Sequence, residues 1–143
     1  MGIVRFNYAD VPSVALDNKR ALKIFIQSIF TMEGKGFEEL NYIFCSDPFL
    51  LDINKRFLNH DFYTDIITFD LSANENTIGE IYISIDTVKD NASSHKTTFK
   101  NELLRVIFHG ALHLCGYKDK KKSEITIMRE KEDYYLQLFL SNQ

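Results

Sequence analysis

Two histidines, a glycine and an aspartate lie close together in the stretch HGALHLCGYKD, residues 109–119. His109 and His113 are four residues apart, so on an α-helix their side chains project about 40° apart and about 6 Å apart along the axis. Two imidazoles at this spacing can share one metal ion. Gly116 can adopt a left-handed conformation that ends the helix and returns the chain. The turn therefore predicts Asp119 as a third ligand, with the fourth position left to water, as in catalytic zinc sites.

The residue after the first histidine separates two kinds of chemistry. In metalloproteases of the HExxH type, a glutamate at this position moves the proton of the metal-bound water. Here the residue is Gly110, which has no side chain for acid–base work. A metalloprotease would therefore need an acid or base from elsewhere in the chain, and this class is disfavoured. A metal-bound water, whose pKa zinc can lower to roughly 7, could still attack a phosphodiester.

The elements that must hold these residues can be read from the spacing of the apolar side chains. The stretch 99–114 is apolar at helical spacing and predicts one long helix that carries both histidines. Further helices are predicted near 17–32, from 46–48 to about 57–58, from 86 to about 94, and from about 123 to 140. Alternation predicts strands at 3–8, 39–45, 65–71 and 77–85, the last two joined by a hairpin turn or short loop at 73–76. We therefore expect an α+β fold, with the histidine-bearing helix packed along one face of a sheet of about four strands.

Length and composition narrow the class of protein. The chain has 143 residues, of which 45% are hydrophobic and 26% charged, and this suits one globular domain over residues 1–143. No apolar run approaches the roughly 20 residues that span a bilayer, and no secretory signal is visible, so no membrane partner is expected. Only Cys45 and Cys115 could form a disulfide, which fits a reducing cytoplasm. A formal net charge of −3 argues against a generally basic nucleic-acid binder but allows local basic patches.

Three blocks of the sequence together resemble a known family. HGALHLCGYKD (109–119) is similar to the HGxLHLxGYDH motif of the YbeY endoribonucleases. NKRFLNHDFYTDIITF (54–69) resembles that family's NxxYRxxxxPTDVLSF block, and GEIYIS (79–84) resembles its GDIxIS strand. The resemblance covers nearly the entire chain and implies a zincin-like mixed sheet packed with helices and one Zn²⁺ per chain. It also implies cleavage of single-stranded RNA in ribosomal RNA maturation and ribosome quality control, with the small ribosomal subunit, and no DNA, as partner.

The chain departs from the family motifs at functional positions. The family's third ligand is histidine, where this chain has Asp119. Two imidazoles and a carboxylate suit zinc but also other divalent transition metals. The family's arginine, which the resemblance gives a part in catalysis, aligns with Leu58, and its proline aligns with Tyr63. A leucine cannot contact a phosphate, and His60 or Arg56 could approach the same space instead.

The residues beside the predicted metal site allow two interpretations each. Asp65 matches the aspartate of the family's TD pair. It either supports the site by accepting loop amides or takes part directly in catalysis. A basic run adjoins Asp119 and could hold an RNA backbone near the metal, or could simply be solvated. This run consists of Lys118, in place of the motif's aspartate, together with Lys120, Lys121 and Lys122.

The sequence therefore predicts a cytoplasmic metal-dependent endoribonuclease. Its catalytic residues would be His109, His113 and Asp119, acting through the metal-bound water. One alternative is a metal-stabilised ribosome assembly factor with little or no nuclease activity, which the Leu58 departure favours. A two-histidine, one-carboxylate iron oxygenase is disfavoured, because its ligands normally come from strands of a β-barrel rather than from one helix.

Overall fold

The structure, a computed structural model, describes residues 2–60 and 64–142, and this part of the chain contains four strands and five helices. The strands are β1 (Ile3–Tyr8), β2 (Gly36–Cys45), β3 (Ile66–Asp70) and β4 (Asn76–Ser84). The helices are α1 (Lys19–Met32), α2 (Asp47–Leu58), α3 (Ile85–Ser94), α4 (Phe99–Leu114) and α5 (Lys122–Ser141). Each strand and helix predicted from the sequence is present, with boundaries that differ by a few residues.

Strand β2 begins at residue 36, three residues before the predicted range 39–45. Gly34 has a φ of +71° and follows the last turn of α1, as a helix stop should. Gly36 lies beyond this helix stop and is the first residue of β2. A Cβ at this position would lie 2.5 Å from the side-chain oxygen of Asn76 and 2.8 Å from the carbonyl oxygen of Glu75. The absence of a side chain at this position therefore allows β2 to pair closely with the start of β4.

The four strands form one mixed sheet in the order β1-β2-β4-β3. β1 pairs with β2, and β2 with β4, in parallel, whereas β3 and β4 are antiparallel. The antiparallel pair confirms the hairpin predicted around residues 73–76. The α+β prediction with a mixed four-stranded sheet is thus confirmed.

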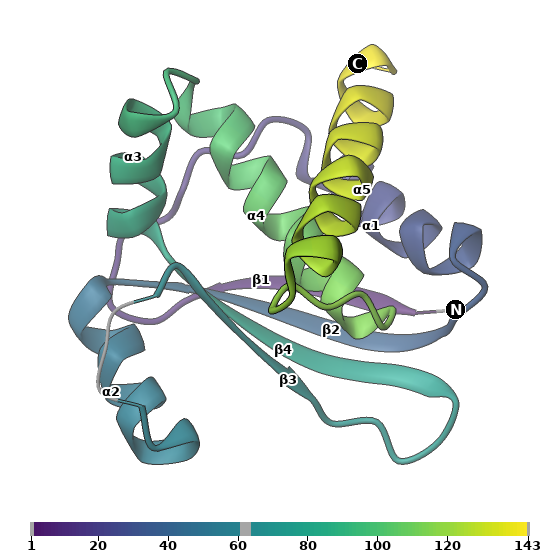
Figure 1. Ribbon diagram of the computed structural model, residues 1–143, viewed down its shortest axis with the longest axis horizontal. Helices are drawn as coiled ribbons and strands as arrows, with labels where there is room; N and C mark the ends of the chain where they lie inside the picture. The colour runs from purple at the N-terminus through teal and green to yellow at the C-terminus, as the bar shows by residue number, and fades with distance from the viewer. Residues whose placement is uncertain (1, 61–63, 143) are drawn as a thin grey trace.

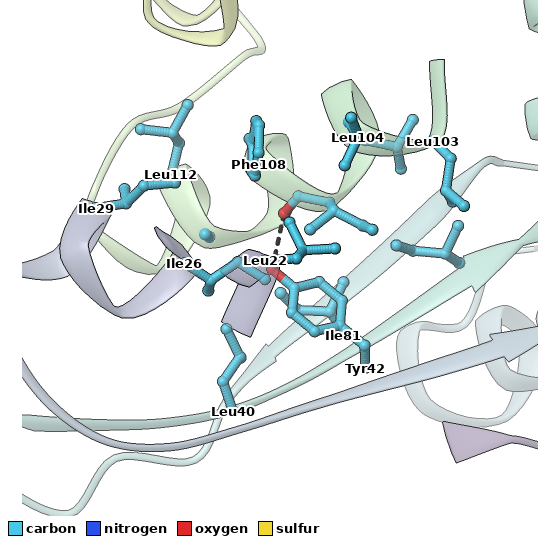
Figure 2. Packing of buried hydrophobic residues seen from close by; sticks show 14 of the residues in the cluster. Leu22, Ile26, Ile29, Leu40, Tyr42, Ile81, Leu103, Leu104, Phe108 and Leu112 are labelled. Carbon is cyan, nitrogen blue, oxygen red and sulfur yellow. Dashed lines mark hydrogen bonds between the residues drawn. The ribbon is translucent and has the colours of Figure 1, made fainter. Parts of the chain in front are cut away.

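Helix α4 crosses one face of the sheet, with α1 and α5 beside it (Figure 1). Its apolar side chains pack against Leu40, Tyr42 and Ile81 of the sheet and against α1, as Figure 2 shows. The Tyr42 hydroxyl, buried in this core, donates a hydrogen bond of 2.8 Å to the carbonyl oxygen of Ile107. This contact ties the middle of α4 directly to β2, so the helix that carries the histidines has a fixed position on the sheet.

Helix α2 lies on the opposite side of the sheet (Figure 1). It covers only part of that face, through a small apolar cluster of Cys45, Leu50, Ile53 and Ile67. Ser46 caps its start by accepting from the backbone N–H of Phe49, and α2 ends at Leu58. The ring of Phe57, near the end of α2, lies 6.1 Å from the ring of Phe69 in the edge strand β3. Among the described residues, no helix is both long and apolar enough to cross a membrane.

Candidate metal centre

The last two turns of α4 present two imidazoles side by side. The ring centroids of His109 and His113 are 4.5 Å apart and the rings are nearly perpendicular, at 86°. Both side chains are mostly buried, with exposed fractions of 18% and 26%. The start of the helix is capped by Thr98, whose hydroxyl accepts from the backbone N–H of Asn101 at 3.1 Å. Because α4 is regular between these points, the four-residue spacing places both rings on one face.

The turn after α4 returns the chain to these rings. Gly116 has a φ of +107°, and its N–H donates to the carbonyl oxygen of His113 at 3.0 Å. The next N–H, of Tyr117, donates to the carbonyl oxygen of Leu112 at 3.1 Å. The paired bonds and the left-handed glycine form the helix ending expected from the sequence. Asp119 then lies beside both histidines.

The geometry of the three side chains fits a bound metal ion. Oδ2 of Asp119 lies 3.2 Å from Nε2 of His109 and 3.2 Å from Nε2 of His113. With bonds of roughly 2.0–2.1 Å, two ligand atoms at corners of a tetrahedron are about 3.3 Å apart. All three ligand atoms lie within 4.8 Å of one another. His109, His113 and Asp119 could therefore hold one divalent ion with little rearrangement.

Each histidine is oriented by a partner at its other ring nitrogen. Nδ1 of His109 lies 2.5 Å from Oε2 of Glu132, and Nδ1 of His113 lies 2.9 Å from the carbonyl oxygen of Tyr117. With the proton on Nδ1, both rings turn an unprotonated Nε2 toward Asp119, as metal-ligating histidines usually do. Burial acts to lower the pKa of His109, but the hydrogen bond and negative charge of Glu132, with the charges of Asp119 and Asp65, outweigh it and raise that pKa.

Glu132 contacts the candidate centre and was missed by the sequence analysis. Its side chain, on α5, is buried, and its other oxygen lies 3.1 Å from Arg105 and 3.4 Å from Arg129. A signal was present in the sequence, because Glu132 interrupts the apolar stripe of α5. The buried residues of that helix are Met128, Glu132, Tyr135 and Phe139. A carboxylate at a core position needs partners, and Glu132 has His109 at one oxygen and the two arginines at the other.

The structure also explains why residue 110 is a glycine. A Cβ at this position would lie 2.8 Å and 2.9 Å from two side-chain atoms of Ile81 and 3.1 Å from Ile66 Cδ1. Position 110 therefore faces the sheet, while the histidines face the space between β3 and α5. A larger side chain at position 110 would collide with the sheet, so both the residue present and the packing around it disfavour the glutamate that the HExxH mechanism needs.

Two hollows meet at the candidate centre, and Asp65, His109 and Asp119 line both. The larger has a volume of about 840 Å³, within the roughly 300–1,000 Å³ of small-ligand sites. Leu58, His60 and Lys120 line its walls. The smaller, about 220 Å³, extends between α4 and α5. Burial raises the pKa of Asp65, and the charge of His109 partly offsets this rise.

Three other residues predicted to contact substrate, all in the described part of the chain, are absent from the lining of the two hollows. Lys118 and Lys121 are exposed, and within the described ranges neither lines the two hollows. Arg56 is exposed on α2 and forms an ion pair of 3.0 Å with Asp52, so it points along its own helix. Tyr63, aligned with the family's proline, lies outside the described residues.

Comparison with known proteins agrees with the sequence motifs. A family model described as endoribonuclease YbeY matches residues 9–139. The endoribonuclease YbeY of Flavobacterium psychrophilum is 50% identical over 80% of this chain and 82% of its own length, and that of Cytophaga hutchinsonii is 48% identical over 93% and 94%. The solution structure of TM1509 from Thermotoga maritima matches with a TM-score of 0.63 and 27% identity, covering 98% of this chain and 91% of that one. The resemblance expected from the three blocks is confirmed, and the chain belongs to the endoribonuclease YbeY family.

Proposed function

We propose that the protein is a metal-dependent endoribonuclease that cleaves single-stranded RNA. The observation that carries this proposal is the cluster of His109, His113 and Asp119 opening onto the larger hollow. Membership of a family whose curated members are named endoribonucleases supplies the substrate class. We further propose that the RNA is ribosomal, that the small ribosomal subunit is the partner in the cytoplasm, and that residues 1–143 act as one domain.

His109, His113 and Asp119 would hold the metal, for which we propose Zn²⁺. A divalent ion here would supply a Lewis acid for a phosphate oxygen and would lower the pKa of a bound water to about 7. The protein's own part is to fix the ligands. Glu132 keeps a proton on Nδ1 of His109, and the Tyr117 carbonyl does the same for His113, so that both Nε2 atoms stay available. Asp119 contributes a negative charge in place of a neutral imidazole, which widens the range of metals that the site tolerates.

The substrate side of the site is weakly cationic. Lys120 lines the larger hollow and is the best placed lysine to hold a phosphate. Lys118 and Lys121 are exposed nearby and would contact the RNA backbone without reading its sequence. Leu58 also lines the hollow and contributes no charge where the family motif has arginine. We therefore expect slow cleavage.

The lack of charge at Leu58 also supports the alternative of an assembly factor that binds metal and cuts little RNA. The two functions separate in a cleavage assay on a single-stranded RNA oligonucleotide, using protein stripped with a chelator and reloaded with Zn²⁺. The nuclease is supported if slow cleavage returns when the metal is restored and is lost in His113→Ala. Asp90→Ala, which changes an exposed residue of α3, is the control and should cleave RNA as wild type does. Leu58→Arg should increase the rate.

The proposal is refuted if the reloaded protein binds metal but neither wild type nor Leu58→Arg cleaves RNA. That result, together with co-sedimentation with small ribosomal subunits, would favour the assembly factor. Unfolded casein should remain intact throughout, since position 110 faces the sheet. Casein cleavage that His113→Ala abolishes would instead indicate a protease.

A further inference from the structure

Glu33, the residue that caps the end of α1, gathers hydrogen bonds from two other parts of the fold. The hydroxyl of Tyr117 donates to Oε1 at 2.6 Å, the hydroxyl of Tyr135 donates to Oε2, and Nζ of Lys131 lies 3.2 Å from Oε2. Only 11% of the Glu33 side chain is exposed. Burial would raise the pKa of Glu33, but these three donors lower it. The carboxylate is therefore charged at neutral pH and accepts from three donors.

Glu33 is itself held in place by the backbone. Its N–H donates to the carbonyl oxygen of Ile29 at 2.9 Å, which closes the last turn of α1. Ile29 and its neighbour Phe30 are fully buried in the main core. The carboxylate thus has a defined position relative to the sheet and to α4.

Tyr117 connects this carboxylate to the candidate metal centre. Its carbonyl oxygen accepts from Nδ1 of His113 at 2.9 Å, and it lies in the turn that leads to Asp119. The ammonium group of Lys131 lies 5.5 Å from the centre of the Tyr117 ring. The side chain of Tyr117 is therefore held from two sides, while its backbone holds a metal-binding histidine.

We propose that Glu33 is a positioning residue for the metal centre. By holding the Tyr117 hydroxyl, it fixes the turn whose carbonyl orients His113 and whose next residues deliver Asp119. Glu33 touches neither the metal ligands nor the larger hollow lined by Leu58 and Lys120. The inference rests on the metal site of the proposed function, but it does not require that RNA is cut.

Two matched variants test this role, because Tyr117→Phe and Tyr135→Phe each remove one hydroxyl that donates to Glu33. Only Tyr117 belongs to the turn that carries the ligands. Tyr117→Phe should raise the dissociation constant for Zn²⁺ by about 3–10-fold, less than the roughly 10–100-fold seen when a direct partner of a ligand is removed, because its carbonyl remains. Tyr135→Phe should bind Zn²⁺ as wild type does.

The measurements are Zn²⁺ affinity by chelator competition and the visible absorption spectrum of the Co²⁺-loaded protein, which reports ligand geometry. Urea unfolding of the metal-free proteins should show both variants folded and similarly destabilised. Glu33→Ala should weaken Zn²⁺ binding at least as much as Tyr117→Phe. The double variant Glu33→Ala/Tyr117→Phe should bind Zn²⁺ no more weakly than Glu33→Ala alone, because both changes break the same contact. Glu33→Gln, which keeps an acceptor oxygen, should restore part of the loss.

Wild-type Zn²⁺ affinity and an unchanged Co²⁺ spectrum in Tyr117→Phe would overturn the inference. Equal weakening in Tyr135→Phe would also overturn it, because the effect would then be general loss of stability. If wild type binds Zn²⁺ and Tyr117→Phe weakens that binding, but no RNA is cleaved, the positioning role stands while the nuclease proposal fails. If wild type binds neither Zn²⁺ nor Co²⁺, the metal centre and this inference fall together.

Discussion

Gly110→Ala tests whether α4 is pressed against the sheet as closely as the geometry indicates. A Cβ at this position would lie 2.8 Å from Cδ1 and 2.9 Å from Cγ2 of Ile81, and 3.1 Å from Cδ1 of Ile66. These distances are shorter than the roughly 3.5–4.0 Å at which carbon atoms attract one another. Either α4 or the two isoleucines must move to admit one methyl group.

The expected change combines two opposing effects. At an exposed position inside a helix, replacing glycine with alanine stabilises the folded protein by about 1 kcal/mol. Inserting a methyl group into a packed core costs about 1–3 kcal/mol. Gly110→Ala should therefore lower the free energy of unfolding by about 0–2 kcal/mol. Gly110→Glu should lower it by about 3–5 kcal/mol, the cost of an uncompensated buried charge, and should produce no protease.

The assay is urea unfolding of the metal-free protein, with Ile81→Val as the partner variant. Ile81→Val removes the Cδ1 atom nearest to the new methyl group. Gly110→Ala should therefore lower the free energy of unfolding less in the Ile81→Val protein than in wild type. The reasoning is refuted if Gly110→Ala stabilises the protein by about 1 kcal/mol and shows no coupling to Ile81→Val. It is also refuted if Gly110→Glu folds normally and digests casein.

Three further predictions concern single side chains. Glu132→Gln should weaken Zn²⁺ binding by about 10–100-fold, because it loses the charge that orients His109, whereas Glu130→Gln on the exposed face of α5 should not; chelator competition measures both. Asp119→Ala should lose most of the bound metal and stay folded, whereas Asp119→His should keep the metal. Elemental analysis measures the bound metal, and circular dichroism shows whether each variant is folded. If Asp119→Ala binds as much metal as wild type, Asp119 is not a ligand. Since the folded-state pKa of Glu33 lies below its ordinary value of 4.5, its contribution to the stability of the metal-free protein is complete above that pH and is lost as the pH falls through the lowered pKa. Urea unfolding of Glu33→Gln should therefore depend less steeply on pH in that range, and identical slopes would contradict the assignment.

Several features of this protein could be determined from the sequence because they depend on residues close together in the chain. Helical periodicity placed His109 and His113 on one face of one helix, and Gly116 made the turn that returns Asp119 to them. Alternation identified the strands, and three motifs identified the family. These features follow from the fixed geometry of the helix, the strand and the glycine turn.

Only the tertiary structure decided which distant residues meet at the centre. Glu132 reaches His109 from 23 positions away, and Glu33 reaches Tyr117 across 84. The direction of position 110 toward Ile81 likewise depends on how α4 is rotated on the sheet. Local periodicity shows which face of an element is buried but not which residues oppose it. That choice depends on the packing of α1, α4 and α5 around one core, where each side chain must fit against its neighbours.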